Sequence, residues 1–156
     1  MKDPAHVWEA TRAAELQHAG LIDPDQADWL GRSMTRLLPM AAPGLRRLTV
    51  RLVQDAQMCA MHERHMHDPA TTDVLTFVDG HEADVAVCVD EARRRAAELG
   101  HPLERELLLY ALHGMLHAAG MDDRTPEDFA RMHAEEDRLL AAIGLEPTFR
   151  PRGDAA

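Results

Sequence analysis

Positive charge and cysteine are both scarce in this chain. Its 156 residues include 17 lysines and arginines against 27 acidic residues, which gives a formal net charge of −10. This balance argues against a protein that binds nucleic acid through bulk charge, although it leaves room for a local basic site. The two cysteines, Cys59 and Cys88, stand far apart in the sequence. Two isolated cysteines do not make a disulfide framework, so we expect two buried free thiols.

Long apolar runs are also missing. The longest, residues 107–112, is far too short to span a bilayer, and no apolar stretch follows the opening Met1-Lys-Asp-Pro4. We therefore expect no membrane segment, no signal peptide and a cytoplasmic location. The length suits one domain, residues 1–156, with a real hydrophobic core and little room for a second.

Hydrophobic patterning and capping residues predict an α+β fold. Residues 5–20 have weak helical periodicity and Asp23-Pro24 has the form of an N-cap with a first-turn proline, so residues 1–40 are expected to be a helical N-terminal part. Strands are predicted at 48–53, 74–78 and 83–89, further helices at 56–66, 91–99, 103–119 and 126–143, and a flexible tail at 147–156. This order indicates a single domain with a small mixed sheet and helices packed mainly on one side.

Two histidines four residues apart, His113 and His117, lie in one of these predicted helices. Four residues at about 100° each leave the two side chains roughly 40° apart around the helix axis, so both imidazoles can converge on one ion. Gly120 is suited to ending the helix, after which Asp122 or Asp123 can return toward the same point. Three protein ligands with one open position are typical of a catalytic zinc site.

The competing interpretation is a chance pair of core or surface histidines. The helix stop and the acidic residues just beyond it favour the metal site over that alternative. The spacing is like that of long-motif zinc proteases, but those have a glutamate directly after the first histidine as general base. Gly114 occupies that position here, so peptide hydrolysis by a glutamate-activated water is disfavoured.

Two motifs resemble those of a known family. The stretch His113-Gly-Met-Leu-His117-Ala-Ala-Gly120-Met-Asp-Asp123 is similar to the H-G-x-L-H-L-x-G-Y-D-H signature of the YbeY family, zinc-dependent endoribonucleases of ribosomal RNA maturation. Thr72-Asp73-Val-Leu-Thr-Phe77 resembles the family's T-D-V-L-S/T-F strand motif. Both motifs occur in the family's order and at about its separation, and the resemblance covers roughly residues 45 to 145. It implies a zinc-metalloprotease-like fold.

The sequence departs from the family pattern at two positions. The family's third metal ligand is usually the last histidine of the signature, and the matching residue here is Asp123. A carboxylate is an accepted zinc ligand, but its charge makes the ion less electrophilic and tilts the preference toward harder ions such as manganese or iron. The family also commonly has an arginine six residues before the threonine of the strand motif. That position here is Met66, and Arg64 is the nearest substitute.

The resemblance implies a function for these residues. One zinc ion held by His113, His117 and Asp123 would serve a single-strand-specific endoribonuclease acting in late maturation of the 16S ribosomal RNA 3′ end and in ribosome quality control. Arg64 and Asp73 would position the phosphate. For Asp73, a structural role as a cap at the start of its strand is an equally good interpretation. The expected partners are single-stranded ribosomal RNA and the small ribosomal subunit or its assembly factors.

A second hypothesis is a ribosome-associated assembly or binding factor whose metal site is structural or degenerate. It is motivated by the replaced third histidine, by the missing arginine and by the acidic net charge. Binding that persists after metal removal would distinguish it from the enzyme. A third interpretation, a metal hydrolase acting on another substrate, has only the predicted site geometry in its favour.

Overall fold

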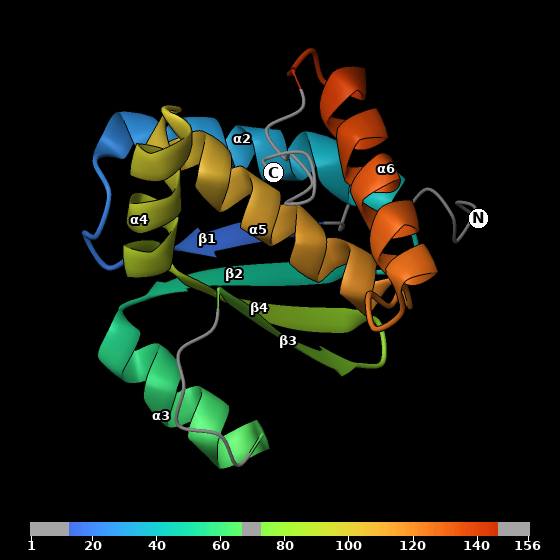
Figure 1. The fold of residues 1–156 in the computed structure, drawn as a ribbon, viewed down its shortest axis with the longest axis horizontal. Helices are drawn as coiled ribbons and strands as arrows, with labels where there is room; N and C mark the ends of the chain where they lie inside the picture. Colours follow the sequence, from blue (N-terminus) through green and yellow to red (C-terminus); the bar gives the residue numbers. More distant parts are fainter. Residues whose placement is uncertain (1–12, 67–72, 147–156) are drawn as a thin grey trace, which may run out of the picture.

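A computed structural model describes residues 13–66 and 73–146 of the chain and shows a four-stranded sheet with five helices (Figure 1). The strands are β1 (Ala13–Gln17), β2 (Arg47–Val53), β3 (Val74–Asp79) and β4 (Glu82–Cys88). The helices are α2 (Pro24–Ala41), α3 (Asp55–Met66), α4 (Val89–Leu99), α5 (Leu103–Ala118) and α6 (Pro126–Ala142). The predicted α+β class and the single domain are confirmed.

The sheet is mixed, as predicted, with the strand order β1-β2-β4-β3. β1, β2 and β4 run parallel, while β3 pairs antiparallel with β4 and forms one edge. A tight turn at Gly80 joins β3 to β4, and its φ of +60° is one that glycine adopts at little cost. The hairpin predicted around this glycine is therefore confirmed.

One sequence-based prediction, helical structure throughout residues 1–40, is wrong in part. Residues 13–17 form the strand β1, and a helix begins only at Pro24. The strand forms because β2 offers a parallel edge in register, with Leu16 opposite Val50, and because Ala14 and Leu16 pack against the core. Such long-range pairing overrides a weak local preference for helix. The rest of that prediction, residues 1–12, and the predicted tail 147–156 lie outside the described residues.

Alternating side chains of β4 show how the layers are arranged. Val85 and Val87 belong to the main core beneath α5, whereas Ala86 and Cys88 belong to a smaller apolar cluster with Met58 of α3. Since neighbouring side chains in a strand point to opposite faces, α3 and α5 lie on opposite sides of the sheet. Of the described helices, α2, α4, α5 and α6 gather on one side of the sheet and only α3 lies on the other (Figure 1). The prediction of helices mainly on one side is confirmed.

Local signals explain where the helices begin. Asp23 caps α2 by accepting a hydrogen bond from the Gln26 backbone at 2.8 Å, and the Gln26 side chain accepts one from the Asp23 backbone in return. Thr125 caps α6 by accepting from the Asp128 backbone at 3.1 Å. Both starts were predicted from sequence. Within the described residues, none of the helices combines the length and the apolarity needed to cross a bilayer.

Candidate metal centre

Helix α5 carries both predicted histidine ligands near its C-terminal end. One turn separates His113 from His117, and their Nε2 atoms lie 3.0 Å apart. The two rings meet edge to face, with centroids 4.5 Å apart. The i, i+4 spacing therefore brings two ring nitrogens to one point, as the sequence predicted.

A glycine turn brings the third ligand back to this point. Gly120 ends α5 with a φ of +98°, and its backbone N–H donates to the His117 carbonyl at 2.9 Å. After this turn, Oδ2 of Asp123 lies 3.3 Å from Nε2 of His113 and 3.7 Å from Nε2 of His117. Of the two aspartates that local geometry left open, Asp123 joins the histidines, whereas Asp122 accepts hydrogen bonds from the backbone of Asp123 and Arg124.

The spacing of these three donor atoms fits a metal ion. Zinc ligands at about 2.0–2.1 Å in tetrahedral geometry lie about 3.3 Å from one another, and the three observed separations are 3.0, 3.3 and 3.7 Å. Each imidazole also has an acceptor beside its other nitrogen. Nδ1 of His113 lies 2.8 Å from Oε1 of Glu136, and Nδ1 of His117 lies 3.0 Å from the Met121 carbonyl. When each Nδ1 donates a proton to its acceptor, each Nε2 presents its lone pair to the shared point.

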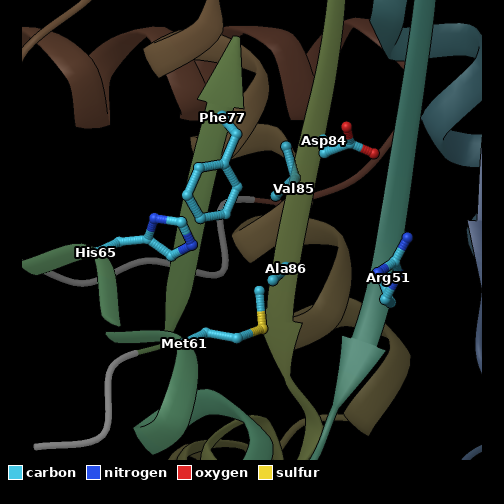
Figure 2. Close-up of a pocket in the computed structure, with 7 residues that line it drawn as sticks. All are labelled: Arg51, Met61, His65, Phe77, Asp84, Val85 and Ala86. Atoms are coloured by element: carbon cyan, nitrogen blue, oxygen red, sulfur yellow. The ribbon is translucent and has the colours of Figure 1, made fainter. Parts of the chain in front are cut away.

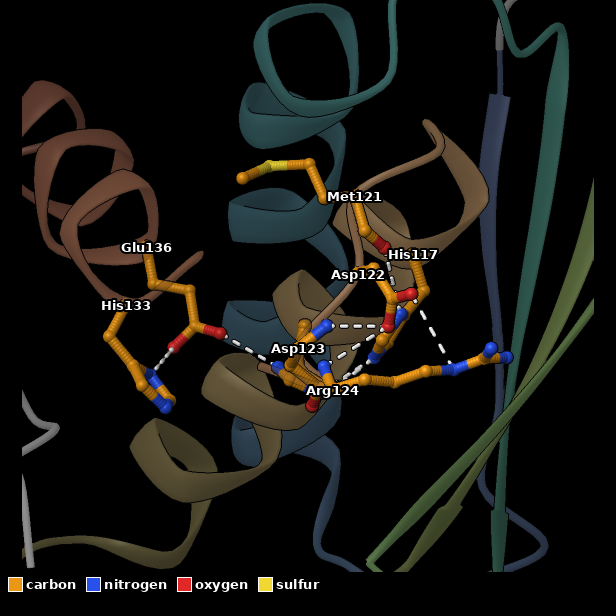
Figure 3. Close-up of polar contacts among 8 residues, drawn as sticks. His117, Met121, Asp122, Asp123, Arg124, His133 and Glu136 are labelled. Carbon is orange, nitrogen blue, oxygen red and sulfur yellow. Dashed lines mark hydrogen bonds and ion pairs between the residues drawn. The ribbon is translucent and has the colours of Figure 1, made fainter. Parts of the chain in front are cut away.

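Glu136 lies beside the candidate metal centre, a position that the sequence did not reveal. It stands in a run of three acidic residues, 135–137, which are ordinarily solvated, yet only 1% of the Glu136 surface is exposed. Figure 3 shows one carboxylate oxygen of Glu136 turned toward His133. Its Oε2 lies 3.1 Å from Nδ1 of His133, and its Oε1 lies 2.8 Å from Nδ1 of His113. A signal was present: Glu136 follows Met132 by four residues and precedes Leu139 by three, so it lies on the buried stripe of α6.

The hydrogen bond between Glu136 and His113 shifts the pKa values of both side chains. Burial acts to raise the pKa of Glu136, but the hydrogen bonds from His113 and His133 outweigh it and hold that pKa below its ordinary value. Burial acts to lower the pKa of His113, and the Glu136 carboxylate outweighs it, with help from the charges of Asp73 and Asp123, so that the pKa is raised. The Glu136 side chain in the middle of α6 is therefore held in its charged form, hydrogen-bonded to Nδ1 of His113.

Gly114 allows α5 to lie this close to the sheet. A Cβ atom at this position would lie 2.5 and 2.9 Å from the two methyl carbons of Val85 and 3.3 Å from the hydroxyl of Thr76. Val85 is itself 1% exposed and has little room to move. A glycine directly after His113 thus allows α5, with its two histidines, to lie close to β3 and β4, besides disfavouring the protease mechanism.

The two residues expected to position phosphate are placed differently. Asp73 precedes β3, its carbonyl accepts a hydrogen bond from the Cys88 backbone, and its charge acts on His113. Arg64 is exposed on α3, on the opposite side of the sheet from α5, and forms no hydrogen bond or ion pair with the three ligands in the described structure. The structure therefore places Asp73 within electrostatic reach of the centre and does not bring Arg64 to it. Both roles stay predictions.

A second group of potential ligands, Asp55, Cys88 and Asp90, is occupied by internal contacts. Arg94 binds both carboxylate oxygens of Asp55 at 2.9 Å, and Asp90 accepts from the Asp55 backbone at 2.8 Å. Burial, with the neighbouring Asp55 carboxylate, raises the pKa of the Cys88 thiol to about 11, so the thiol stays protonated. The group therefore connects α3 and α4. Both cysteines are free, and Cys88 is buried as expected, whereas Cys59 is only half-buried.

Comparison with known proteins gives one consistent family. The family model described as "Endoribonuclease YbeY" matches residues 23–144. The endoribonuclease YbeY of Symbiobacterium thermophilum is 33% identical over 138 residues, which cover 78% of this chain and 88% of the relative. That of Frankia alni is 33% identical over 158 residues, which cover 88% and 87%.

A solved structure supports the fold. The solution structure of TM1509 from Thermotoga maritima superposes with a TM-score of 0.56 at 21% sequence identity, covering 83% of this chain and 91% of that one. At this identity the likeness concerns the fold alone, which is the zinc-metalloprotease-like arrangement that the two motifs implied. Since the family model spans most of the chain and includes all three clustered ligands, this protein belongs to the YbeY family.

Proposed function

We propose that this protein is a metal-dependent, single-strand-specific endoribonuclease that acts in late maturation of the 16S ribosomal RNA 3′ end and in ribosome quality control. The observation that supports the proposal best is the convergence of His113, His117 and Asp123 within 4.8 Å of one another in a chain of the YbeY family. Its substrate is single-stranded ribosomal RNA, its partners are the small ribosomal subunit or assembly factors, and it acts in the cytoplasm.

The donor set suits one zinc ion. When bound, such an ion supplies Lewis-acid chemistry that polarises a phosphoryl oxygen or makes water more acidic. The anionic Asp123 in place of a third histidine lowers that electrophilicity, and harder divalent ions such as manganese are alternatives. Cleavage adds water across one P–O bond and leaves a hydroxyl on one RNA fragment and a phosphate on the other.

The other residues of this chain hold the ligands and the substrate. Glu136 and the Met121 carbonyl fix the ring orientations of His113 and His117 through their Nδ1 atoms. Asp73, at the start of β3, is proposed to orient the phosphate through hydrogen bonding. Arg64 is proposed as the phosphate-binding cation, a role that requires the RNA to extend to the side of α3.

The test is the metal content of the purified protein, measured by elemental mass spectrometry, together with cleavage of a single-stranded RNA. We expect about one ion per chain in the wild type, and loss of both metal and cleavage in His117→Ala and Asp123→Ala. Chelation should abolish cleavage, and added zinc should restore it. A folded His117→Ala variant that cuts RNA at the wild-type rate would disprove the metal mechanism.

The second candidate is an assembly or binding factor with a structural or degenerate site. The observations in its favour are Asp123 at a usual histidine position, Met66 at the usual arginine position and the net charge of −10. It predicts that binding to small ribosomal subunits survives chelation and that the metal-loaded protein leaves RNA intact. Sedimentation with purified subunits, with and without chelator, separates the two functions.

A further inference from the structure

A pocket lies on the side of the sheet that α3 covers only in part. Its volume is about 260 Å³, and it is lined by residues of α3, β2, β3 and β4, namely Arg51, Met61, His65, Phe77, Asp84, Val85 and Ala86. This volume is below the roughly 300 Å³ at which pockets for drug-sized ligands begin. The pocket is therefore large enough for one small group, such as a single planar ring, and too small for a whole cofactor.

The walls combine two chemical characters. Figure 2 shows the Phe77 and His65 rings side by side, with Met61 and Ala86 below them, as an apolar and aromatic wall. The two ring centroids are 4.7 Å apart. Asp84 of β4 and Arg51 of β2 stand across the pocket from this wall (Figure 2). A flat ring with polar edges suits these walls, because its face can stack while its edge forms hydrogen bonds.

Asp84 and Arg51 would recognise different parts of a ligand. In the described structure the Asp84 carboxylate forms no hydrogen bond or ion pair, so its oxygens are open to a donor. Arg51 uses its Nε to bind the Gln17 side chain at 3.1 Å, which leaves its terminal nitrogens for an anion. Of the two single-ring bases of RNA, cytosine offers its exocyclic amino group to an aspartate, whereas uracil lacks that amino group and offers only its ring N3–H. An arginine beside it suits a phosphate.

The pocket and the candidate metal centre lie near opposite faces of one strand, β3. Thr76 lies against Gly114 of α5, and Phe77, the next residue of β3, points into the pocket on the opposite face. Val85 is close to both the helix α5 and the pocket: its methyl groups lie under Gly114, and the residue also lines the pocket. Since β3 is an edge of the described sheet, an extended RNA strand that passes around β3 can occupy both the pocket and the candidate metal centre.

We infer that this pocket holds one unpaired base of the RNA substrate, stacked on Phe77 and selected by Asp84 in favour of cytosine over uracil, with Arg51 on an adjoining phosphate. The inference rests on the proposed function, because it assumes an RNA substrate. It adds a specificity subsite on the sheet face opposite the metal ligands. Stacking on an aromatic side chain and one amino-to-carboxylate hydrogen bond are the two interactions that it requires.

Binding of cytidine and uridine monophosphates to the metal-depleted full-length protein tests the subsite without cleavage. Backbone amide NMR signals of Phe77, Asp84 and Arg51 should shift on titration, with the cytidine nucleotide bound about tenfold more tightly, as expected for one hydrogen bond to a charged group. Shifts confined to α5 and α6, or equal affinity for the two nucleotides, would overturn the inference. So would shifts at the pocket with a lysine-rich peptide but not with nucleotides, since that result would mark a protein-binding surface.

Three variants separate stacking from base selection. Asp84→Asn should remove the preference for cytosine and keep uridine binding, because an amide offers a donor as well as an acceptor. Phe77→Leu should weaken both nucleotides about tenfold, since it keeps an apolar side chain but removes the stacking ring. Glu82→Gln is the matched control: Glu82 lies two residues before Asp84 on the same face of β4, outside the pocket lining, and its substitution should change neither affinity. An Asp84→Asn protein that retains the full preference contradicts the inference.

Cleavage of short RNAs then distinguishes failure of the subsite from failure of the proposed function. With the metal-loaded protein, Asp84→Asn should raise KM for a cytosine-containing oligonucleotide about tenfold and leave kcat unchanged. An unchanged KM in this variant, beside normal cleavage, contradicts the subsite alone. Absence of cleavage in the wild-type protein contradicts the proposed function, whereas nucleotide binding in the metal-depleted protein is measured independently of it.

Discussion

Among single residues, one buried carboxylate lies beside the three predicted ligands of the candidate metal centre. Glu136 is enclosed in α6 and its two oxygens bind Nδ1 of His113 and of His133. A buried carboxylate is costly unless it is hydrogen-bonded, and each of its two oxygens has a histidine partner. The acid therefore orients His113 and increases the basicity of the nitrogen that faces the ligand cluster.

Removal of this charge should weaken metal binding without removing a ligand. Glu136→Gln keeps the size of the side chain, and we expect zinc affinity to fall about 10- to 100-fold, the usual effect of losing a hydrogen-bonding partner of a metal-ligating histidine. Competition with a chromophoric chelator measures this affinity. Glu135→Gln is the control, because Glu135 pairs with Arg138 on the surface and should leave zinc affinity unchanged. Equal affinities in the wild type and Glu136→Gln would show that the carboxylate does not support the site.

At the scale of elements, the close approach of α5 to the sheet is decided at Gly114. A helical glycine costs about 1 kcal/mol relative to alanine, so its retention inside α5 needs a packing reason. The reason is Val85, whose methyl carbons would lie 2.5 and 2.9 Å from a new Cβ. Overpacking of a rigid core costs about 1–3 kcal/mol and exceeds the helix gain.

Gly114→Ala should therefore lower the free energy of unfolding, by about 1–2 kcal/mol, as measured by denaturant titration. Gly31→Ala in α2 is the matched control, because nothing lies within 4 Å of its added Cβ. That variant should gain about 0.5–1 kcal/mol. The double variant Gly114→Ala/Val85→Ala should be more stable than the sum of the two single changes predicts, because the smaller side chain relieves the overlap. A stabilised Gly114→Ala protein would contradict the packing argument.

Also at this scale, the elements differ in how well local signals predicted them. The capped helices α2 and α6 begin as expected, since Asp23 and Thr125 bond to the backbone three residues ahead. Strand β1 was not predicted, because its five residues become a strand through pairing with β2, more than thirty residues later in the chain. Local periodicity has no information about such a partner.

At the scale of the whole molecule, the contact between α3 and α4 ties the lone helix to the opposite side of the sheet. Arg94 of α4 binds the Asp55 carboxylate at the start of α3 with two hydrogen bonds of 2.9 Å. These bonds outweigh a small cost of burial and lower the pKa of Asp55 to about 2. Because the carboxyl group is more acidic in the folded than in the unfolded chain, its contribution to stability is present above about pH 4 and is lost as the pH falls toward 2.

Asp55→Asn should consequently destabilise the protein at pH 6 and have a progressively smaller effect as the pH falls from 4 to 2. The effect should be small, since both side chains are more than a third exposed and solvent screens the pair. Urea titrations of both proteins across this range measure the difference. In an Arg94→Gln background most of the pH dependence of this difference should disappear, with a small remainder from the Cys88 thiol, which also donates to Asp55 at 3.2 Å. An undiminished pH dependence there would contradict the role of Arg94.

Local sequence signals predicted four features of this protein: the i, i+4 histidines, the glycine turn after them, the capped helices and the two motifs of the YbeY family. These features depend on residues within a few positions of one another, so helix geometry and turn chemistry predict them. Three other features follow from tertiary packing: the geometry by which Asp123 completes the cluster, the contact of Glu136 with His113, and the position of Arg64 across the sheet from that histidine. Each of these depends on packing between elements distant in sequence, and no local periodicity encodes which buried partner a charge will meet.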